Sequence, residues 1–161
     1  VRRPISAFFP CFNDAGTIAS MVMEALVVLR ELASEYEVIV VENGSTDYAW
    51  DVLDELERLY GENGVDTRDR GRVRIIRFAE ALDYGGALRA GFAACRYDLI
   101  FYTDGDGQYD VRELRSLYAA LEREEGAGRR VDVVMGNKIT RRDPAHRRFI
   151  SSSATSSSES S

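Results

Sequence analysis

The stretch Phe101-Tyr-Thr-Asp104-Gly-Asp106-Gly-Gln108 joins an apolar run to two aspartates, and it decides how this chain is interpreted. The apolar run, 98–102, is typical of a strand buried in a parallel sheet, and ligands bind beyond the carboxyl ends of such strands. Two carboxylates held close together repel each other unless a cation lies between them. Hard divalent ions such as Mg2+ bind carboxylate oxygens together with substrate phosphates. The stretch therefore suggests a metal-bridged diphosphate, although an Asp-x-Asp triplet alone occurs in many surface turns.

Short apolar runs alternate with helical patterns along the whole chain. We expect strands at 5–9, 36–41, 73–78, 99–103 and 131–135, and helices at 16–32, 48–60, 84–96 and 111–125. This alternation predicts an α/β fold with a mostly parallel sheet and helices on both faces. The polar segment 61–72 is the predicted mobile internal loop. We predict one domain over residues 1–150, followed by a serine-rich disordered tail or linker at 151–161, which has no apolar side chains to bury.

The bulk composition excludes several classes of protein. The chain has 161 residues, 45% of them hydrophobic, which fits one domain with a real core, and its net charge of −6 argues against a nucleic-acid partner. No apolar run approaches the roughly 20 residues of a membrane span, and the amino end has no signal-peptide pattern. Cys11 and Cys95 are interpreted as reduced thiols of a cytoplasmic protein. A single histidine, His146, excludes a histidine-rich zinc site.

The loops that follow the first three predicted strands are polar. Asn13 and Asp14 follow the first strand and could cap the next helix or form an edge for a nucleobase. Glu42 and Asn43 follow the second and could form hydrogen bonds to a base or a ribose. Small residues from Gly85 onward open the third helix, where they allow a ligand or a neighbouring backbone to come close.

A basic segment, 136–148, follows the fifth predicted strand. It holds Lys138, the only lysine of the chain, together with several arginines that include Arg142. Such a segment is either a solvated charged loop or a phosphate clamp, because guanidinium groups pair with phosphate oxygens through paired hydrogen bonds. The clamp is favoured somewhat because a diphosphate site is suggested independently.

Taken together, the polar pieces resemble glycosyltransferase family 2, which has the GT-A fold. They occur in the family's order: Phe9-Pro10-Cys-Phe-Asn13-Asp14, Val40-Val-Glu42-Asn43-Gly-Ser-Thr-Asp47, Gly85-Gly-Ala-Leu-Arg-Ala-Gly91 and Asp104-Gly-Asp106-Gly-Gln108. The last piece, with its glutamine, looks most like the polyprenyl-phosphate sugar transferases, such as dolichol-phosphate mannose synthase. The resemblance covers about residues 4–151. Two departures stand out: Glu42-Asn43 replaces two aspartates, and Asp14 replaces a glutamate.

The resemblance implies a metal-dependent, inverting glycosyltransferase with a GT-A, Rossmann-like sheet. Its donor would be a UDP- or GDP-sugar, its acceptor a polyprenyl phosphate and its cofactor Mg2+ or Mn2+. The implied roles are these: Asp104 and Asp106 catalytic; Asp106 and Gln108 metal ligands; Pro10, Phe12, Asp14, Glu42, Asn43, Gly85, Asp104, Gly105, Lys138 and Arg142 substrate-binding. Members of the family continue beyond this carboxyl end, so the chain is expected to be truncated there. The full-length protein would then lie in the cytoplasm or at the cytoplasmic face of a membrane.

Two other functions stay open, and a third is disfavoured. A sugar nucleotidyltransferase of related architecture usually has a glycine-rich, basic loop after its first strand, and Pro10-Cys-Phe-Asn-Asp is neither. A nucleotide-sugar-binding module without catalysis is compatible with the Glu42-Asn43 change. A nicotinamide-dependent dehydrogenase is disfavoured because no Gly-x-Gly-x-x-Gly follows the first strand.

Overall fold

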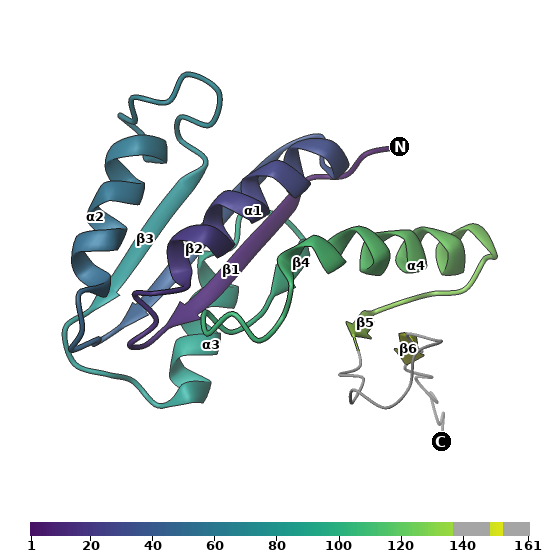
Figure 1. Ribbon diagram of the computed structural model, residues 1–161. Helices are drawn as coiled ribbons and strands as arrows, with labels where there is room; N and C mark the ends of the chain where they lie inside the picture. The colour runs from purple at the N-terminus through teal and green to yellow at the C-terminus, as the bar shows by residue number, and fades with distance from the viewer. Residues whose placement is uncertain (137–148, 153–161) are drawn as a thin grey trace. The chain divides into compact units, whose positions relative to one another are not determined.

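The computed structural model describes residues 1–136 and the backbone of 149–152, and it divides at Arg112 into two compact units. The first unit alternates strands and helices in chain order (Figure 1). Its elements are β1 (Ile5–Cys11), α1 (Ile18–Leu32), β2 (Tyr36–Asn43), α2 (Ala49–Tyr60), β3 (Val73–Phe78), α3 (Tyr84–Ala94) and β4 (Leu99–Tyr102).

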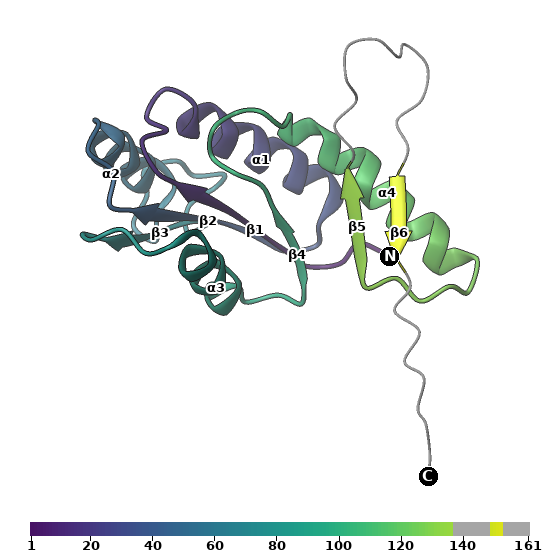
Figure 2. The ribbon, with the colours of Figure 1, turned by 90° about the horizontal axis from the view of Figure 1, so that it is seen from below.

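The four strands of the first unit form one parallel sheet in the order β3-β2-β1-β4. Figure 2 shows α1 and α2 on one face of this sheet and α3 on the other. The predicted α/β fold, with a parallel sheet covered on both faces, is therefore confirmed. The register pairs Cys11 with Glu42 and Asn43 with Phe78, so the carboxyl ends of neighbouring strands lie at one edge.

The core lies on both sides of the two central strands, which are buried along their whole length. Side chains of α1 at helical spacing, among them Ile18, Val22 and Leu29, are fully buried as well. On the other face α3 approaches β1 closely at Gly91, where a Cβ would lie 2.3 Å from the ring of Phe8. Tight helix–sheet packing therefore explains why this position is glycine.

The segment 61–72, which the sequence predicts to be mobile, is tied to its surroundings by hydrogen bonds. Asp69 is buried, pairs with Arg30 and accepts a hydrogen bond from the Tyr36 hydroxyl at 2.8 Å. Within the segment, the N–H of Gly71 donates to the carbonyl of Gly61 at 2.8 Å. Polar residues without helical or strand periodicity here form a specific network with α1 and β2, and the mobility of the segment stays a prediction.

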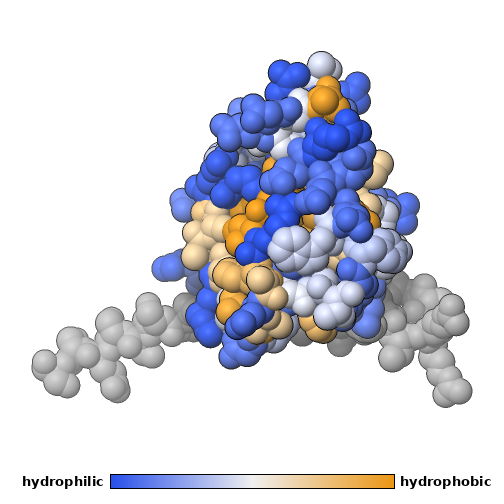
Figure 3. All heavy atoms as spheres, turned by 90° about the vertical axis from the view of Figure 1, so that its left-hand side faces the viewer, coloured by the Kyte–Doolittle hydropathy of each residue, from blue (hydrophilic) through white to orange (hydrophobic). Residues whose placement is uncertain are grey.

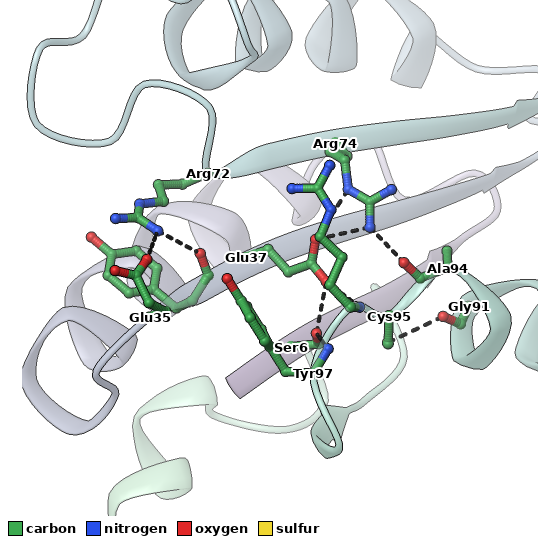
Figure 4. Close-up of polar contacts among 11 residues, drawn as sticks. Ser6, Glu35, Glu37, Arg72, Arg74, Gly91, Ala94, Cys95 and Tyr97 are labelled. Atoms are coloured by element: carbon green, nitrogen blue, oxygen red, sulfur yellow. Dashed lines mark hydrogen bonds and ion pairs between the residues drawn. The ribbon is translucent and has the colours of Figure 1, made fainter. Parts of the chain in front are cut away.

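A second polar network, with a buried carboxylate at its centre, lies at the amino end of the sheet (Figure 4). Glu37 of β2 accepts hydrogen bonds from Ser6 Oγ at 2.7 Å, Arg74 Nη2 at 2.8 Å and the N–H of Arg96 at 2.7 Å. The N–H of Tyr97 donates to Ser6 Oγ at 3.1 Å. These bonds join β1, β2, β3 and the start of β4, and they compensate for removing a charge from water.

One face of the first unit can be followed in a space-filling view (Figure 3). On the side of α2 and β3, hydrophilic side chains predominate and hydrophobic ones show between them (Figure 3). Scattered apolar exposure of this kind is normal for a folded protein. Among the described residues, none of the helices is long and apolar enough to cross a bilayer.

The second unit contains α4 (Leu114–Gly126), preceded by a 3₁₀ turn (Val111–Glu113), and two short strands. The predicted fifth strand is present as β5 (Val133–Gly136), but it pairs antiparallel with β6 (Phe149–Ser152), and the parallel sheet does not include it. No pattern in the sequence predicts β6, which includes the first two residues of the segment predicted to be a tail. Residues 153–161 lie outside the described ranges.

Candidate functional site

Four loops meet at the carboxyl edge of the parallel sheet, one after each strand. We call them the first loop (12–17), the second loop (44–48), the third loop (79–83) and the fourth loop (103–110). Because the strands are parallel and in register, the polar residues of all four loops emerge at the same edge. This edge is opposite to the Glu37 network.

Asn13 joins the first loop to the second. Its backbone adopts a φ of 55°, a left-handed conformation that asparagine tolerates better than most residues. Its Oδ1 accepts hydrogen bonds from the N–H groups of Thr46 at 2.7 Å and Asp47 at 3.2 Å, and its own N–H donates to Ser45 Oγ at 3.0 Å. Asp47 Oδ2 accepts from the N–H of Ala15 at 3.0 Å. The two loops therefore form one rigid piece.

Glu42 lies behind the second loop. It is fully buried, and its two carboxylate oxygens accept hydrogen bonds from the N–H groups of Gly44 at 3.1 Å and Ser45 at 2.8 Å. Gly44 has a φ of 74°, and a Cβ there would lie 2.7 Å from the N of Ala81. Glu42 thus shapes the turn of the second loop, a role that the sequence did not indicate. Its contact with a base stays a prediction.

Asn43 joins the second loop to the third. Its Nδ2 donates to the carbonyl of Leu82 at 3.0 Å, and its Oδ1 accepts from the N–H of Leu82 at 2.7 Å. An aspartate could accept the second bond but could not donate the first. The amide is therefore matched to the backbone of the third loop.

Tyr84 joins the start of α3 to the fourth loop. Asp83 caps this helix, since its Oδ1 accepts from the N–H of Gly86 at 2.6 Å. The Tyr84 hydroxyl then donates to Asp104 Oδ1 at 2.9 Å. Partial burial of the hydroxyl, the hydrogen bond to Asp104 and the negative charge of Asp104 together raise the pKa of Tyr84 to about 12. No pattern in the sequence assigns a role to Tyr84, because no spacing rule connects it to Asp104.

Gly105 joins the fourth loop back to the first. Its N–H donates to the carbonyl of Pro10 at 3.0 Å, and its carbonyl accepts from Thr17 Oγ1 at 2.5 Å. A Cβ at Gly105 would lie 2.8 Å from the Pro10 oxygen and 3.2 Å from Asp14 Oδ2. Gly105 is buried, so its predicted contact with substrate would be made from inside the packed loop.

Acidic side chains gather where the first and fourth loops meet. Asp14 Oδ2 accepts a hydrogen bond from the N–H of Phe12 at 3.1 Å. Burial is the main cause that raises the pKa of Asp14 above its ordinary value of 3.8, and the hydrogen bond from Phe12 opposes it. The negative charges of Asp106, Asp47 and Asp104 raise the pKa further. The edge therefore brings several carboxylates together.

Most of the predicted site residues are brought to this edge. Pro10 is buried at the end of β1, Phe12 is half exposed, and Gly85 lies in the first turn of α3. Asp106 and Gln108 are exposed on the fourth loop. Lys138 and Arg142 lie outside the described residues.

Asp106 stabilises a local turn of the fourth loop. Its Oδ1 accepts from the N–H of Gln108 at 3.0 Å, and Gly107 adopts a φ of 74° in the same turn. Over residues 1–136, no three or more His, Cys, Asp or Glu side chains are grouped so that they could hold a metal ion by themselves.

Comparisons with known proteins agree with this architecture. The family described as Glycosyl transferase family 2 matches residues 6–158. The chain is 29% identical, over 75% of its length, to the dolichyl-phosphate beta-glucosyltransferase of Saccharomyces cerevisiae. It is 28% identical, over 90% of its length, to the undecaprenyl-phosphate 4-deoxy-4-formamido-L-arabinose transferase of Pseudomonas fluorescens. These matches cover only 35% and 38% of the two relatives.

Among solved structures, S. aureus TarS (residues 1–349) shares the fold. The TM-score is 0.54 at 17% identity, and the match covers 76% of this chain and 33% of that chain.

Proposed function

Because the chain belongs to glycosyl transferase family 2, we propose that it carries the donor-binding part of an enzyme that transfers a sugar from a UDP- or GDP-sugar to a polyprenyl phosphate. The two relatives described above are named as transferases that act with dolichyl and undecaprenyl phosphate. The chain spans little more than a third of their length, so the acceptor side of the reaction is assigned by similarity alone.

The observation that carries the proposal is the convergence of Asp104, Asp106 and Asp14 at the carboxyl edge of the sheet. Burial is the main cause that raises the pKa of Asp14, and the negative charges of Asp106 and Asp104 raise this pKa further. A diphosphate brought to this edge would be repelled by these carboxylates. A divalent cation between carboxylate and phosphate oxygens removes that repulsion.

The residues present fit Mg2+ or Mn2+ held jointly by protein and donor. Such ions are usually bound through one or two carboxylates, with substrate phosphates and water completing the shell. The described residues offer exposed carboxylates on the fourth loop but no complete set of three ligands. We assign Asp106 and Gln108 as the metal ligands. When bound, the ion would neutralise the negative charge that develops on the leaving nucleoside diphosphate.

The loops would hold the remaining parts of the donor. Phe12 and Pro10 would border the base, with Asp14, Glu42 and Asn43 around the base and ribose, and Gly85 would let the donor approach the start of α3. Asp104, next to Gly105, would contact the ribose or support the metal ligands. Lys138 and Arg142, which lie outside the described residues, would pair with phosphate oxygens.

The reaction would proceed with inversion at the anomeric carbon. An oxygen of the acceptor phosphate attacks this carbon from the face opposite the leaving group. The bond to the nucleoside diphosphate breaks, and its electron pair leaves with the diphosphate. The acceptor phosphate is already ionised near neutral pH, so the step needs no general base from the protein. The basic segment 141–148 would either meet an anionic lipid surface, at about 1 kcal/mol for each basic residue close to it, or serve only the phosphates of the substrate.

The test is a panel of thermal-shift and calorimetric binding measurements with the 161-residue chain. UDP, GDP and their sugar conjugates are compared with Mn2+ and with a chelator. We expect one nucleotide series to stabilise the protein only with the metal, and Asp106→Asn to abolish that effect. Asp51→Asn, which changes an exposed acid in the first turn of α2, should bind like the wild type. Unchanged binding by Asp106→Asn would contradict the assignment.

One observation favours a second function, nucleotide-sugar binding without transfer. The side chains of Glu42 and Asn43 are both engaged with the backbone of the second and third loops. A base would then be held by fewer side chains than in a site with two uncommitted aspartates. Release of nucleoside diphosphate upon addition of polyprenyl phosphate would exclude this alternative, and tight donor binding without any release would favour it.

A further inference from the structure

We propose that Tyr84 is a positioning residue for the donor site: its hydroxyl holds the carboxylate of Asp104 in the orientation that the donor and its metal require. The inference deepens the proposed function and rests on it for the identity of the ligand. The contact that carries it is the hydrogen bond of 2.9 Å from the Tyr84 hydroxyl to Asp104 Oδ1.

This bond closes a ring that the four loops form around the carboxyl edge. The first and second loops are joined through Asn13, and the second and third through Asn43. The fourth loop is joined back to the first through Gly105. The Tyr84–Asp104 bond joins the start of α3 to the fourth loop.

Hydrogen bonds hold the backbone on both sides of Tyr84. Leu82, two residues before Tyr84, is held at both backbone polar groups by Asn43. Asp83 then fixes the first turn of α3 by capping the N–H of Gly86. The phenol therefore starts from a well-defined backbone position. Such support is what distinguishes a positioned side chain from a mobile surface tyrosine.

The backbone and the side chain of the fourth loop are held by different contacts. The backbone next to Asp104 is fixed at Gly105, which is packed against Pro10 and Thr17. Asp104 is exposed, and its carboxylate accepts a hydrogen bond from the Tyr84 hydroxyl. Without that bond the carboxylate would rotate about its side-chain torsions while the loop backbone stayed in place.

The role is separable from folding. The Tyr84 side chain is 58% exposed, so it contributes little to the core. Removing only its hydroxyl should leave the fold intact and act on the orientation of Asp104. Tyr36 offers a matched control, because its hydroxyl forms a hydrogen bond of 2.8 Å to the buried Asp69 at the opposite end of β2.

The experiment compares Tyr84→Phe, Tyr36→Phe and the wild type in two measurements on the 161-residue chain. The first needs no ligand: NMR relaxation of the Asp104 side chain, which reports how freely its carboxylate rotates. We expect faster motion of that side chain in Tyr84→Phe and no change in it in Tyr36→Phe. The second is calorimetric affinity for UDP and GDP with Mn2+. We expect Tyr84→Phe to weaken the affinity about three- to tenfold, the effect of one net hydrogen bond, and Tyr36→Phe to leave it unchanged.

The two measurements separate the failure of this inference from the failure of the proposed function. If the wild type binds nucleotide and Tyr84→Phe binds equally well, the positioning role is overturned. If the wild type binds no nucleotide, the proposed donor is wrong, and the relaxation data alone decide whether Tyr84 holds the Asp104 carboxylate. Unchanged relaxation of Asp104 in Tyr84→Phe would overturn that as well. A double variant with Asp104→Asn should lose no further affinity beyond Asp104→Asn itself.

Discussion

The carboxamide of Asn43 satisfies both backbone polar groups of Leu82, donating to its carbonyl at 3.0 Å and accepting from its N–H at 2.7 Å. Asn43, which the family resemblance places beside a base, therefore also joins the second loop to the third. The amide suits this role because it carries a donor and an acceptor side by side.

Asn43→Asp should destabilise the protein. The carboxylate cannot donate to the Leu82 carbonyl, and it places a negative oxygen against that carbonyl instead. We expect a loss of about 1–3 kcal/mol in the free energy of unfolding, the cost of leaving a buried polar group unpaired. Urea denaturation measures it. Asn63→Asp, at an exposed loop position, is the control and should be near neutral. Equal stability of Asn43→Asp and wild type would show that the amide donor contributes nothing.

Gly105→Ala should disturb the junction of the first and fourth loops. The new methyl group would lie 2.8 Å from the Pro10 carbonyl oxygen and 3.2 Å from Asp14 Oδ2, and the first of these contacts is with backbone that cannot easily move. We expect a loss of about 1–3 kcal/mol and weaker metal-dependent nucleotide binding.

The matched control for that change is Gly126→Ala. No heavy atom lies within 4 Å of a Cβ at Gly126, which ends α4, so the substitution should be neutral or slightly stabilising. Thermal unfolding of the two variants compares them directly. A Gly105→Ala protein as stable as Gly126→Ala would mean that the two loops are not packed as described.

The lowered pKa of Glu37, at the opposite edge of the sheet, predicts that the stability of the protein depends on pH. Burial alone would raise its pKa, but hydrogen bonds from Arg96, Ser6 and Arg74 outweigh it, so the pKa lies below the ordinary value of 4.5. A lowered folded-state pKa adds stability that is complete above pH 4.5 and is lost as the pH falls through the folded-state value.

The measurement is the difference in unfolding free energy between wild type and Glu37→Gln across pH 2–7. We expect the wild type to be more stable by about 1.5–3 kcal/mol above pH 4.5, the range for hydrogen bonds to a charged group. The difference should shrink towards acid pH. Glu122→Gln, on the exposed face of α4, should show no such dependence. A difference that grew towards acid pH would contradict the sign of the shift.

The sequence predicted the helices, the strands and the loops of the first unit, but not the contacts between the loops. Apolar runs predicted β3 at 73–78, as observed, and the edge where the polar residues gather followed from parallel strand order. The link from Tyr84 to Asp104 spans two elements, and a contact of that kind depends on how helices pack. The same holds for Glu42, whose burial behind Gly44 and Ser45 reflects the turn geometry.

Two further findings have the same origin. The pattern along the chain does not reveal that Asp69, in the polar segment 61–72, contacts Arg30 and Tyr36. The run at β5 has the composition of a strand, but composition does not select its partner, and it pairs with β6.

The most direct test of the donor site is to locate Mn2+ on the protein by paramagnetic broadening of backbone amide signals in the presence of UDP or GDP. We predict strong broadening at the fourth loop around Asp106 and at the first loop around Asp14, and none around Glu37 at the other edge of the sheet. Asp106→Asn should remove the broadening. Broadening centred elsewhere, or unaffected by that substitution, would contradict the account.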